Sequence, residues 1–130
     1  MVMKVILDTN FLIYCAKNRL DYVEALDSLI NGEYELVVPM QVIRELELLR
    51  DDKKKKVSGK DKRSIDLALQ LLDANKVRRV KVKGKTVDDG IISLSKENKK
   101  NITCTLDREM RGILGRVILI SRGKKLILTR

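Results

Sequence analysis

The chain contains no histidine among its 130 residues. This absence excludes Ser-His-Asp and Cys-His catalysis, acid–base chemistry by imidazole, and nearly all zinc-finger and zinc-hydrolase designs. Tryptophan is also absent, and there are only one phenylalanine and three tyrosines. We therefore do not expect the aromatic platforms on which many single-strand-binding proteins stack bases.

Cysteine and long apolar runs are scarce as well. Cys15 and Cys104 form no CxxC pair, so each is expected to be a small buried hydrophobe in a reducing compartment, although the sequence leaves a disulfide open. No stretch approaches the roughly 20 apolar residues of a membrane-spanning helix. The start MVMKVILDTN lacks the features of a signal peptide. We expect a cytoplasmic protein with no membrane partner, folded as a single domain over residues 1–130.

Positive charge is abundant. The chain has 28 Lys and Arg against 18 Asp and Glu, which gives a net charge of +10 and a pI near 9.8. Lys and Arg that neutralise phosphates gain free energy from counterion release, so this excess favours a polyanion such as nucleic acid as partner. The alternative is a Lys- and Glu-rich surface that serves heat stability or solubility.

Strand-like and helix-like segments alternate along the chain. The predicted strands cover residues 4–7, 34–38, 77–82, 102–106, 117–120 and 126–128. The predicted helices cover residues 9–17, 21–31, 40–49, 65–74, 88–98 and 108–114. This alternation predicts an α/β fold, a three-layer α/β/α sandwich with a central, mainly parallel sheet. The lysine-rich stretch at residues 51–60 is predicted to be a mobile loop.

Two acidic residues follow predicted strands. Asp8 comes directly after the strand at residues 4–7, and Asp107 directly after the strand at residues 102–106. Either acid alone has an ordinary explanation as a surface residue or a helix cap. Sheets with helical crossovers, however, bind ligands just outside the carboxyl ends of their strands. The two acids are therefore expected to meet at one edge of the sheet.

Two further acids fall on predicted helices. At about 100° per residue, Glu45 lies at the border of the apolar stripe of its helix, whereas Glu47 projects nearly opposite. Asp88 is predicted in the middle of the inward stripe of the later helix, where a carboxylate needs a partner. Its neighbour Asp89 completes a capping-box pattern, Thr-Val-Asp-Asp, and is either a helix cap or a further metal ligand.

Together these acids predict a carboxylate metal site assembled from distant parts of the chain. Carboxylates without imidazole or thiolate partners suit hard cations, chiefly Mg²⁺ or Mn²⁺. A receiver domain would normally have adjacent acids after its first strand, and here the sequence is DTN. The DxD opening of haloacid-type phosphatases and the Gly-rich loop of P-loop proteins are also missing.

Four segments in this order resemble the PIN-domain nucleases: ILDTNFLI, PMQVIREL, VDDGIISLS and TCTLDREM. The resemblance spans most of the chain and is strongest to the archaeal and eukaryotic branch that cuts precursor ribosomal RNA. The resemblance to the VapC toxin branch is looser. It implies a compact α/β/α sandwich and Mg²⁺- or Mn²⁺-dependent hydrolysis of single-stranded RNA.

The family's acidic positions carry over to four residues: Asp8, Glu45, Asp88 and Asp107. The resemblance implies that the first is the central metal ligand and the two later aspartates are further ligands. The glutamate would ligate through water or orient the attacking water. Asn10 and Thr105 match the family's polar residues beside the first and last acids, and are expected to hydrogen-bond the ligands. A helix cap and an ordinary strand residue are the alternatives for these two.

Basic residues predicted to hold the RNA backbone are Lys53, Lys54, Lys55, Lys56, Lys60 and Arg63. Arg108 and Arg111 lie close enough to Asp107 in sequence to contact the scissile phosphate. A merely solvated loop is the alternative for the lysine run. The resulting hypothesis is an endoribonuclease of ribosomal RNA processing. Its alternatives are a VapC-type toxin with an antitoxin partner and a non-catalytic module that binds RNA or ribosomes. Because PIN relatives often dimerise, a homodimer is also left open.

Overall fold

The computed structural model describes residues 2–51, 59–121 and 125–129, without the side chains of residues 59 and 60. The strands of these residues are β1 (Met3–Leu7), β2 (Tyr34–Pro39), β3 (Arg78–Val80), β4 (Ile102–Cys104), β5 (Val117–Ile120) and β6 (Leu126–Thr129). The helices are α1 (Thr9–Lys17), α2 (Tyr22–Leu29), α3 (Met40–Asp51), α4 (Gly59–Ala74), α5 (Val87–Lys96), the 3-10 turn η1 (Arg108–Met110) and α6 (Arg111–Leu114).

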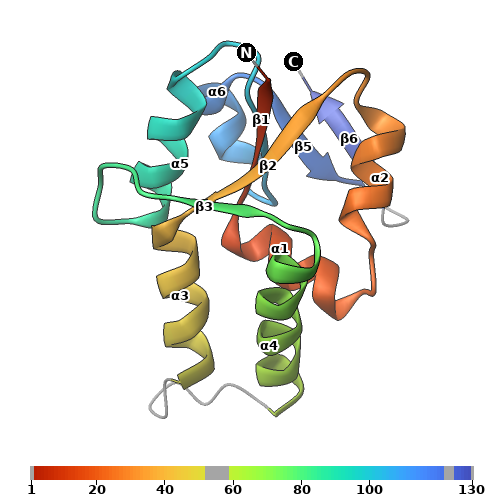
Figure 1. The fold of residues 1–130 in the computed structure, drawn as a ribbon, viewed down its shortest axis with the longest axis vertical. Helices are drawn as coiled ribbons and strands as arrows, with labels where there is room; N and C mark the ends of the chain where they lie inside the picture. Colours follow the sequence, from red (N-terminus) through yellow and green to blue (C-terminus); the bar gives the residue numbers. More distant parts are fainter. Residues whose placement is uncertain (1, 52–58, 122–124, 130) are drawn as a thin grey trace.

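The strands form one six-stranded sheet in the order β3-β2-β1-β4-β5-β6. The pairs from β3 to β5 are all parallel, and only β6 runs antiparallel to its neighbour β5. In Figure 1, β1 runs downward from the amino terminus and leads into α1. β2 and β3 therefore lie on one side of β1, and β4 and β5 lie on the other. Because β1 and β4 are neighbours and parallel, their carboxyl ends lie side by side.

Helices cover both faces of this sheet. Side chains such as Val5 and Leu7 pack with α1, α2, α3 and α4 on one face. Ile6 and Val37 pack with α5, η1 and α6 on the other. Val5, Ile6 and Leu7 are all fully buried, as a central parallel strand covered on both faces requires. The predicted three-layer α/β/α sandwich with a mainly parallel sheet is confirmed.

Two strands are shorter than the sequence predicts. β3 ends at Val80, whose partner Pro39 is the last residue of β2. The chain then enters α3 at Met40, so the residues after Val80 have no strand left to pair with. β4 ends at Cys104, opposite Leu7 at the end of β1. The polar residues beyond both strands are therefore outside the ladder and free to form a site.

The cysteines are buried and unpaired. Cys15 lies on α1 and Cys104 at the end of β4, and both are free. Burial raises the pKa of the Cys15 thiol to about 12. Both residues are part of the core on the α1 side of the sheet, in agreement with their prediction as small buried hydrophobes. Among the described helices, none is long and apolar enough to cross a membrane.

Helices α3 and α5 approach each other closely at Gly90. A Cβ added there would lie 2.8 Å from Oε1 of Gln41 and 3.0 Å from Cβ of Pro39. Gly90 is buried, and Gln41 is only 5% exposed. Close packing therefore requires glycine at this position, and the contact fixes the distance between the two helices at the edge of the sheet where the acids lie.

We expect Gly90→Ala to lower the free energy of unfolding by about 1–3 kcal/mol, because overpacking a tight contact displaces its neighbours. Gly112→Ala is the matched control. Gly112 is also helical, but a Cβ there would meet nothing within 4 Å, so stability should stay unchanged or rise by roughly 0.5–1 kcal/mol. Urea unfolding of the two variants measures the difference. Equal stability of both would show that the contact at Gly90 is not tight.

Candidate active site

Asp8 and Asp107 are joined through Thr105 at the carboxyl ends of β1 and β4. The Thr105 hydroxyl donates to Oδ2 of Asp8 at 2.8 Å and accepts from the backbone N–H of Asp107 at 3.1 Å. The backbone N–H of Asp8 donates to the carbonyl of Cys104 at 3.0 Å. Parallel pairing of β1 with β4 thus brings together two acids that are 99 positions apart in the sequence.

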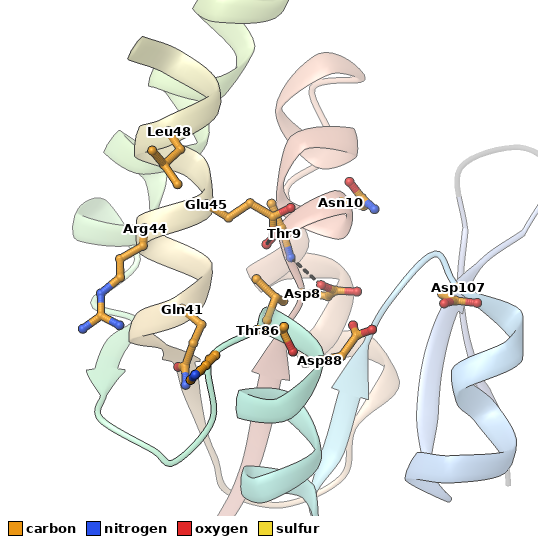
Figure 2. Close-up of a pocket in the computed structure, with 12 residues that line it drawn as sticks. Asp8, Thr9, Asn10, Gln41, Arg44, Glu45, Leu48, Thr86, Asp88 and Asp107 are labelled. Atoms are coloured by element: carbon orange, nitrogen blue, oxygen red, sulfur yellow. Dashed lines mark hydrogen bonds between the residues drawn. The ribbon is translucent and has the colours of Figure 1, made fainter. Parts of the chain in front are cut away.

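Four acids line one pocket of about 580 Å³: Asp8, Glu45, Asp88 and Asp107. Figure 2 shows Asp8 in its middle, Glu45 reaching in from α3, Asp88 from the start of α5, and Asp107 at the far side. The walls also include Thr9, Asn10 and Thr86. The structure therefore places all four predicted acids at one site.

Asp8 is half-buried, and its electrostatics differ from those of an ordinary surface acid. Burial raises the pKa of its carboxyl above the usual range, and the nearby charges of Asp88 and Glu45 add to this rise. Hydrogen bonds from Thr105 and from the backbone N–H of Thr9 oppose the rise. The carboxylate is thus held in place by two donors while its charge is only partly compensated.

Thr9 holds the glutamate of the site. Its hydroxyl donates to Oε2 of Glu45 at 2.8 Å, and the residue is only 2% exposed. Thr9 was not predicted as a site residue, and the N-cap of α1 is its neighbour Asp8. The signal was nevertheless present, because Thr9 directly follows Asp8 and so must lie at the same edge of the sheet. Glu47, two residues after Glu45, is exposed, as predicted.

The position predicted for Asp88 within its helix is wrong. The inward side of α5 is formed by Val87, Gly90, Ile91 and Leu94, and Asp88 is exposed beside it. The apolar pattern placed the inward side of α5 wrongly, because Gly90 is buried but has no side chain that would mark it as apolar. Asp88 still reaches the pocket, because the first turn of α5 lies at its wall.

Asp89 is occupied as a helix cap. Thr86 and Asp89 form a complete capping box, and Oδ2 of Asp89 accepts from the backbone N–H groups of Lys85 and Thr86. These hydrogen bonds, with those of Thr86 largest, lower the pKa of Asp89. It does not line the pocket, so of the two roles considered for Asp89 the structure shows the cap.

Asp107 also accepts a capping bond, from the N–H of Glu109 at 2.9 Å, but its side chain lines the pocket.

The predicted RNA-binding residues whose side chains the structure describes do not line the pocket. Lys53, Lys54, Lys55 and Lys56, like the side chain of Lys60, are outside the described residues. Arg63 is exposed on α4, Arg108 on η1 and Arg111 on α6, and none of the three lines the pocket. Two other cations do line it, Arg44 and Lys85. Neither cation was predicted as a site residue, although Arg44 is adjacent in sequence to Glu45 and Lys85 is close to Asp88.

The pocket suits a hard divalent cation in its chemistry but does not form a closed metal centre. Among the described residues, no three Asp, Glu or Cys side chains come close enough to hold one ion. The available donors are carboxylates and hydroxyls, the preferred partners of Mg²⁺ and Mn²⁺. Burial is the main cause of the raised pKa of Asp8, and the charges of Asp88 and Glu45 add to it. A divalent cation bound beside Asp8 would offset the cost of its charge.

Burial of Asp8 predicts a specific pH dependence of stability in EDTA. Because the folded-state pKa lies above the unfolded one, ionising Asp8 costs stability, and this cost grows as pH rises through the interval between the two values. Asp8→Asn should therefore be more stable than wild type at pH 7.5 and lose this advantage below about pH 3.8, the unperturbed value. Urea unfolding at both pH values measures it. Asp73→Asn, which removes an exposed carboxylate, is the control and should not show this pattern.

Comparison with known proteins places this fold and site in a family. Residues 5–127 match the family model described as PIN like domain. Ribonuclease VapC4 of Methanocaldococcus jannaschii is 32% identical over 108 residues, which cover 83% of this chain and 79% of that protein.

Solved structures show the same fold. The structure of the PIN domain endonuclease Utp24 superposes with a TM-score of 0.75 at 21% identity, over 98% of this chain and 91% of that one. VapBC2 from Rickettsia felis, bound to a DNA fragment from its promoter, gives a TM-score of 0.59 at 16% identity, over 85% of this chain and 93% of that one. With a family match over nearly its whole length and a relative of this identity, the chain belongs to the PIN-like domain family.

Proposed function

We propose that the protein is a divalent-metal-dependent endoribonuclease that hydrolyses phosphodiester bonds of single-stranded RNA. The observation that carries the proposal is the meeting of four carboxylates from four separate segments in one pocket, in a chain without histidine. Support comes from the family and from a relative named as a ribonuclease.

Hydrolysis of a phosphodiester joins a water oxygen to phosphorus and breaks the bond from phosphorus to the leaving ribose oxygen, which takes up a proton. When bound, Mg²⁺ or Mn²⁺ generates a nucleophile from water and neutralises charge on the reacting phosphate. Asp8, Asp88 and Asp107 would hold the cation, directly or through water. Thr105 would fix the Asp8 carboxylate through its bond to Oδ2.

Glu45 is the residue best placed to act on the attacking water. Thr9 bonds its Oε2, which leaves Oε1 to accept a hydrogen bond from the water and orient it. The hydroxyl bond also limits rotation of the carboxylate, so the oxygen that meets the water is defined before the substrate binds. In this way Thr9 and Thr105 would each orient one acid of the site.

Ribosomal RNA processing is the biological role that we favour, in the cytoplasm. It is supported by the resemblance of the segment VDDGIISLS to that branch. The alternative, a VapC-type toxin, is supported by the sequence identity with VapC4. A small antitoxin gene immediately upstream, or an antitoxin that copurifies with the protein, would favour the toxin role over ribosomal RNA processing.

Loss of single carboxylates should abolish cleavage while RNA binding is preserved. We expect Asp8→Asn, Asp107→Asn and Glu45→Gln each to slow cleavage of single-stranded RNA by more than about 100-fold, since outer partners of metal ligands alone are worth about 10–100-fold. Glu47→Gln, an exposed acid two positions away on the same helix, should cut like wild type. Cleavage of labelled RNA in Mn²⁺ measures the rates. If the site variants cut as fast as Glu47→Gln, the protein is a binding module or uses another site.

Metal binding should also be visible without RNA. At a Mn²⁺ concentration about 100 times the dissociation constant, binding to the folded state alone raises the free energy of unfolding by about 2.7 kcal/mol. We expect this gain for the wild type and for Glu47→Gln, and its loss in Asp8→Asn. Thermal unfolding with Mn²⁺ and with EDTA measures it. An equal gain in Asp8→Asn would place the cation elsewhere.

A further inference from the structure

A row of cations follows the exposed edge of the sheet and ends at the acid pocket. β3 is the outermost strand beside β2, and its continuation leads to α5 (Figure 1). Five exposed cations lie along this stretch: Arg78, Arg79, Lys81, Lys83 and Lys85. The last of them lines the pocket, next to Thr86 and Asp88. Because β3 is parallel to β2, the row runs toward the edge of the sheet that carries the acids.

The charges in the second half of this row are not neutralised by nearby acids. Arg78 is paired with Glu35, and Arg79 with Asp73. Across the described part of the chain, no ion pair involves the three lysines at positions 81, 83 and 85. We call residues 81–85 the basic segment. Its lysines are therefore available to an external anion.

Side chains of α3 fix the backbone of the basic segment. The buried amide of Gln41 donates through Nε2 to the carbonyls of Val82 at 3.0 Å and Gly84 at 2.8 Å. Figure 2 shows Gln41 at the base of the pocket, below Arg44 on the same helix. The tie holds the basic segment against the helix that also carries Glu45.

Side chains of α5 hold the same backbone from the other side. The Ser93 hydroxyl donates to the carbonyl of Lys83 at 3.3 Å, and the N–H of Lys85 donates to Asp89 at 3.2 Å. Gly84 has a φ of +119°, and a Cβ there would lie 2.2 Å from Cβ of Asp89. The carbonyls of residues 82, 83 and 84 and the N–H of Lys85 are thus bonded to neighbouring helices, and the lysine side chains are left at the surface.

We propose that the basic segment binds the phosphate backbone of the RNA strand on one side of the scissile bond and leads it into the acid pocket. Arg44 and Leu48 of α3 line the same pocket, and Leu48 is 69% exposed. With few aromatics in the chain, the contact is electrostatic and independent of base sequence, unlike a stacking platform. The proposal rests on the proposed function in that it takes RNA as the polyanion, and it makes Gln41 a positioning residue for the segment.

The test compares two triple variants, each of which loses two lysine charges. Both carry Asp107→Asn, so that bound RNA is not cut. In one, Lys81→Gln and Lys83→Gln change the basic segment. In the control, Lys99→Gln and Lys100→Gln change two exposed lysines just before β4, at the end of the sheet opposite the acids.

The measurement is the affinity for a single-stranded uridine oligonucleotide at a series of salt concentrations. Each lost phosphate contact lowers the slope of log affinity against log salt by about 0.7 for a single strand. The basic-segment variant should therefore lose about 1.4 from the slope, and the control should keep it. Lys81→Arg with Lys83→Arg should also keep the slope, because the charges remain. Circular dichroism shows whether each variant is folded.

An unchanged slope in the basic-segment variant overturns the inference, and the lysines then serve another partner, such as an acidic protein. The same holds if the control loses as much slope, because the effect is then one of net charge. Failure of the proposed function would give a different result. The wild-type protein would then cut no RNA in Mn²⁺, whatever the slopes are.

Discussion

The half-buried carboxylate of Asp8 is the constraint on which the site depends. Burial and two acidic neighbours oppose its charge, while Thr105 and the N–H of Thr9 hold it in place. Replacing such donors by water would not fix the direction of the carboxylate, because only groups on rigid elements hold it there before a ligand binds. The fold thus holds this carboxylate where its charge is unfavourable, and the proposed cation would offset that cost.

The contact between α3 and α5 maintains the rest of the site. Gly90 lets Gln41 pack under the first turn of α5, and Gln41 in turn ties residues 82 and 84 to α3. The spacing of the two helices that carry Glu45 and Asp88 therefore depends on the buried amide of Gln41 and on the small size of Gly90. The same amide connects the acids to the basic segment, so the acidic side of the pocket and the proposed path of the RNA share a support.

Separation of charge within the molecule gives both partners a place. The chain as a whole carries +10, which attracts a polyanion from a distance, whereas the pocket itself is lined by four acids. Phosphates approaching over Lys81, Lys83 and Lys85 would meet the carboxylates only at the pocket, where the proposed cation would screen the repulsion. An acidic centre in a basic surface thereby restricts close contact with phosphate to one position.

The sequence by itself determined the order of strands and helices, the choice of carboxylate chemistry and the four acids of the pocket. The apolar periodicity is local, and strand ends of a parallel sheet converge at one edge, which accounts for Asp8 and Asp107. Asp88 was identified only by the resemblance to the PIN-domain nucleases, because its predicted inward position was wrong. The direction of Asp88 and the role of Thr9 were decided only by the tertiary structure. A buried glycine leaves no apolar signal, so the inward side of α5 was misplaced. A hydrogen bond between Thr9 and Glu45 spans 36 positions, and the pairing of Gln41 with residues 82 and 84 spans more than 40. Such partners depend on how helices pack across the sheet edge, which no local pattern contains.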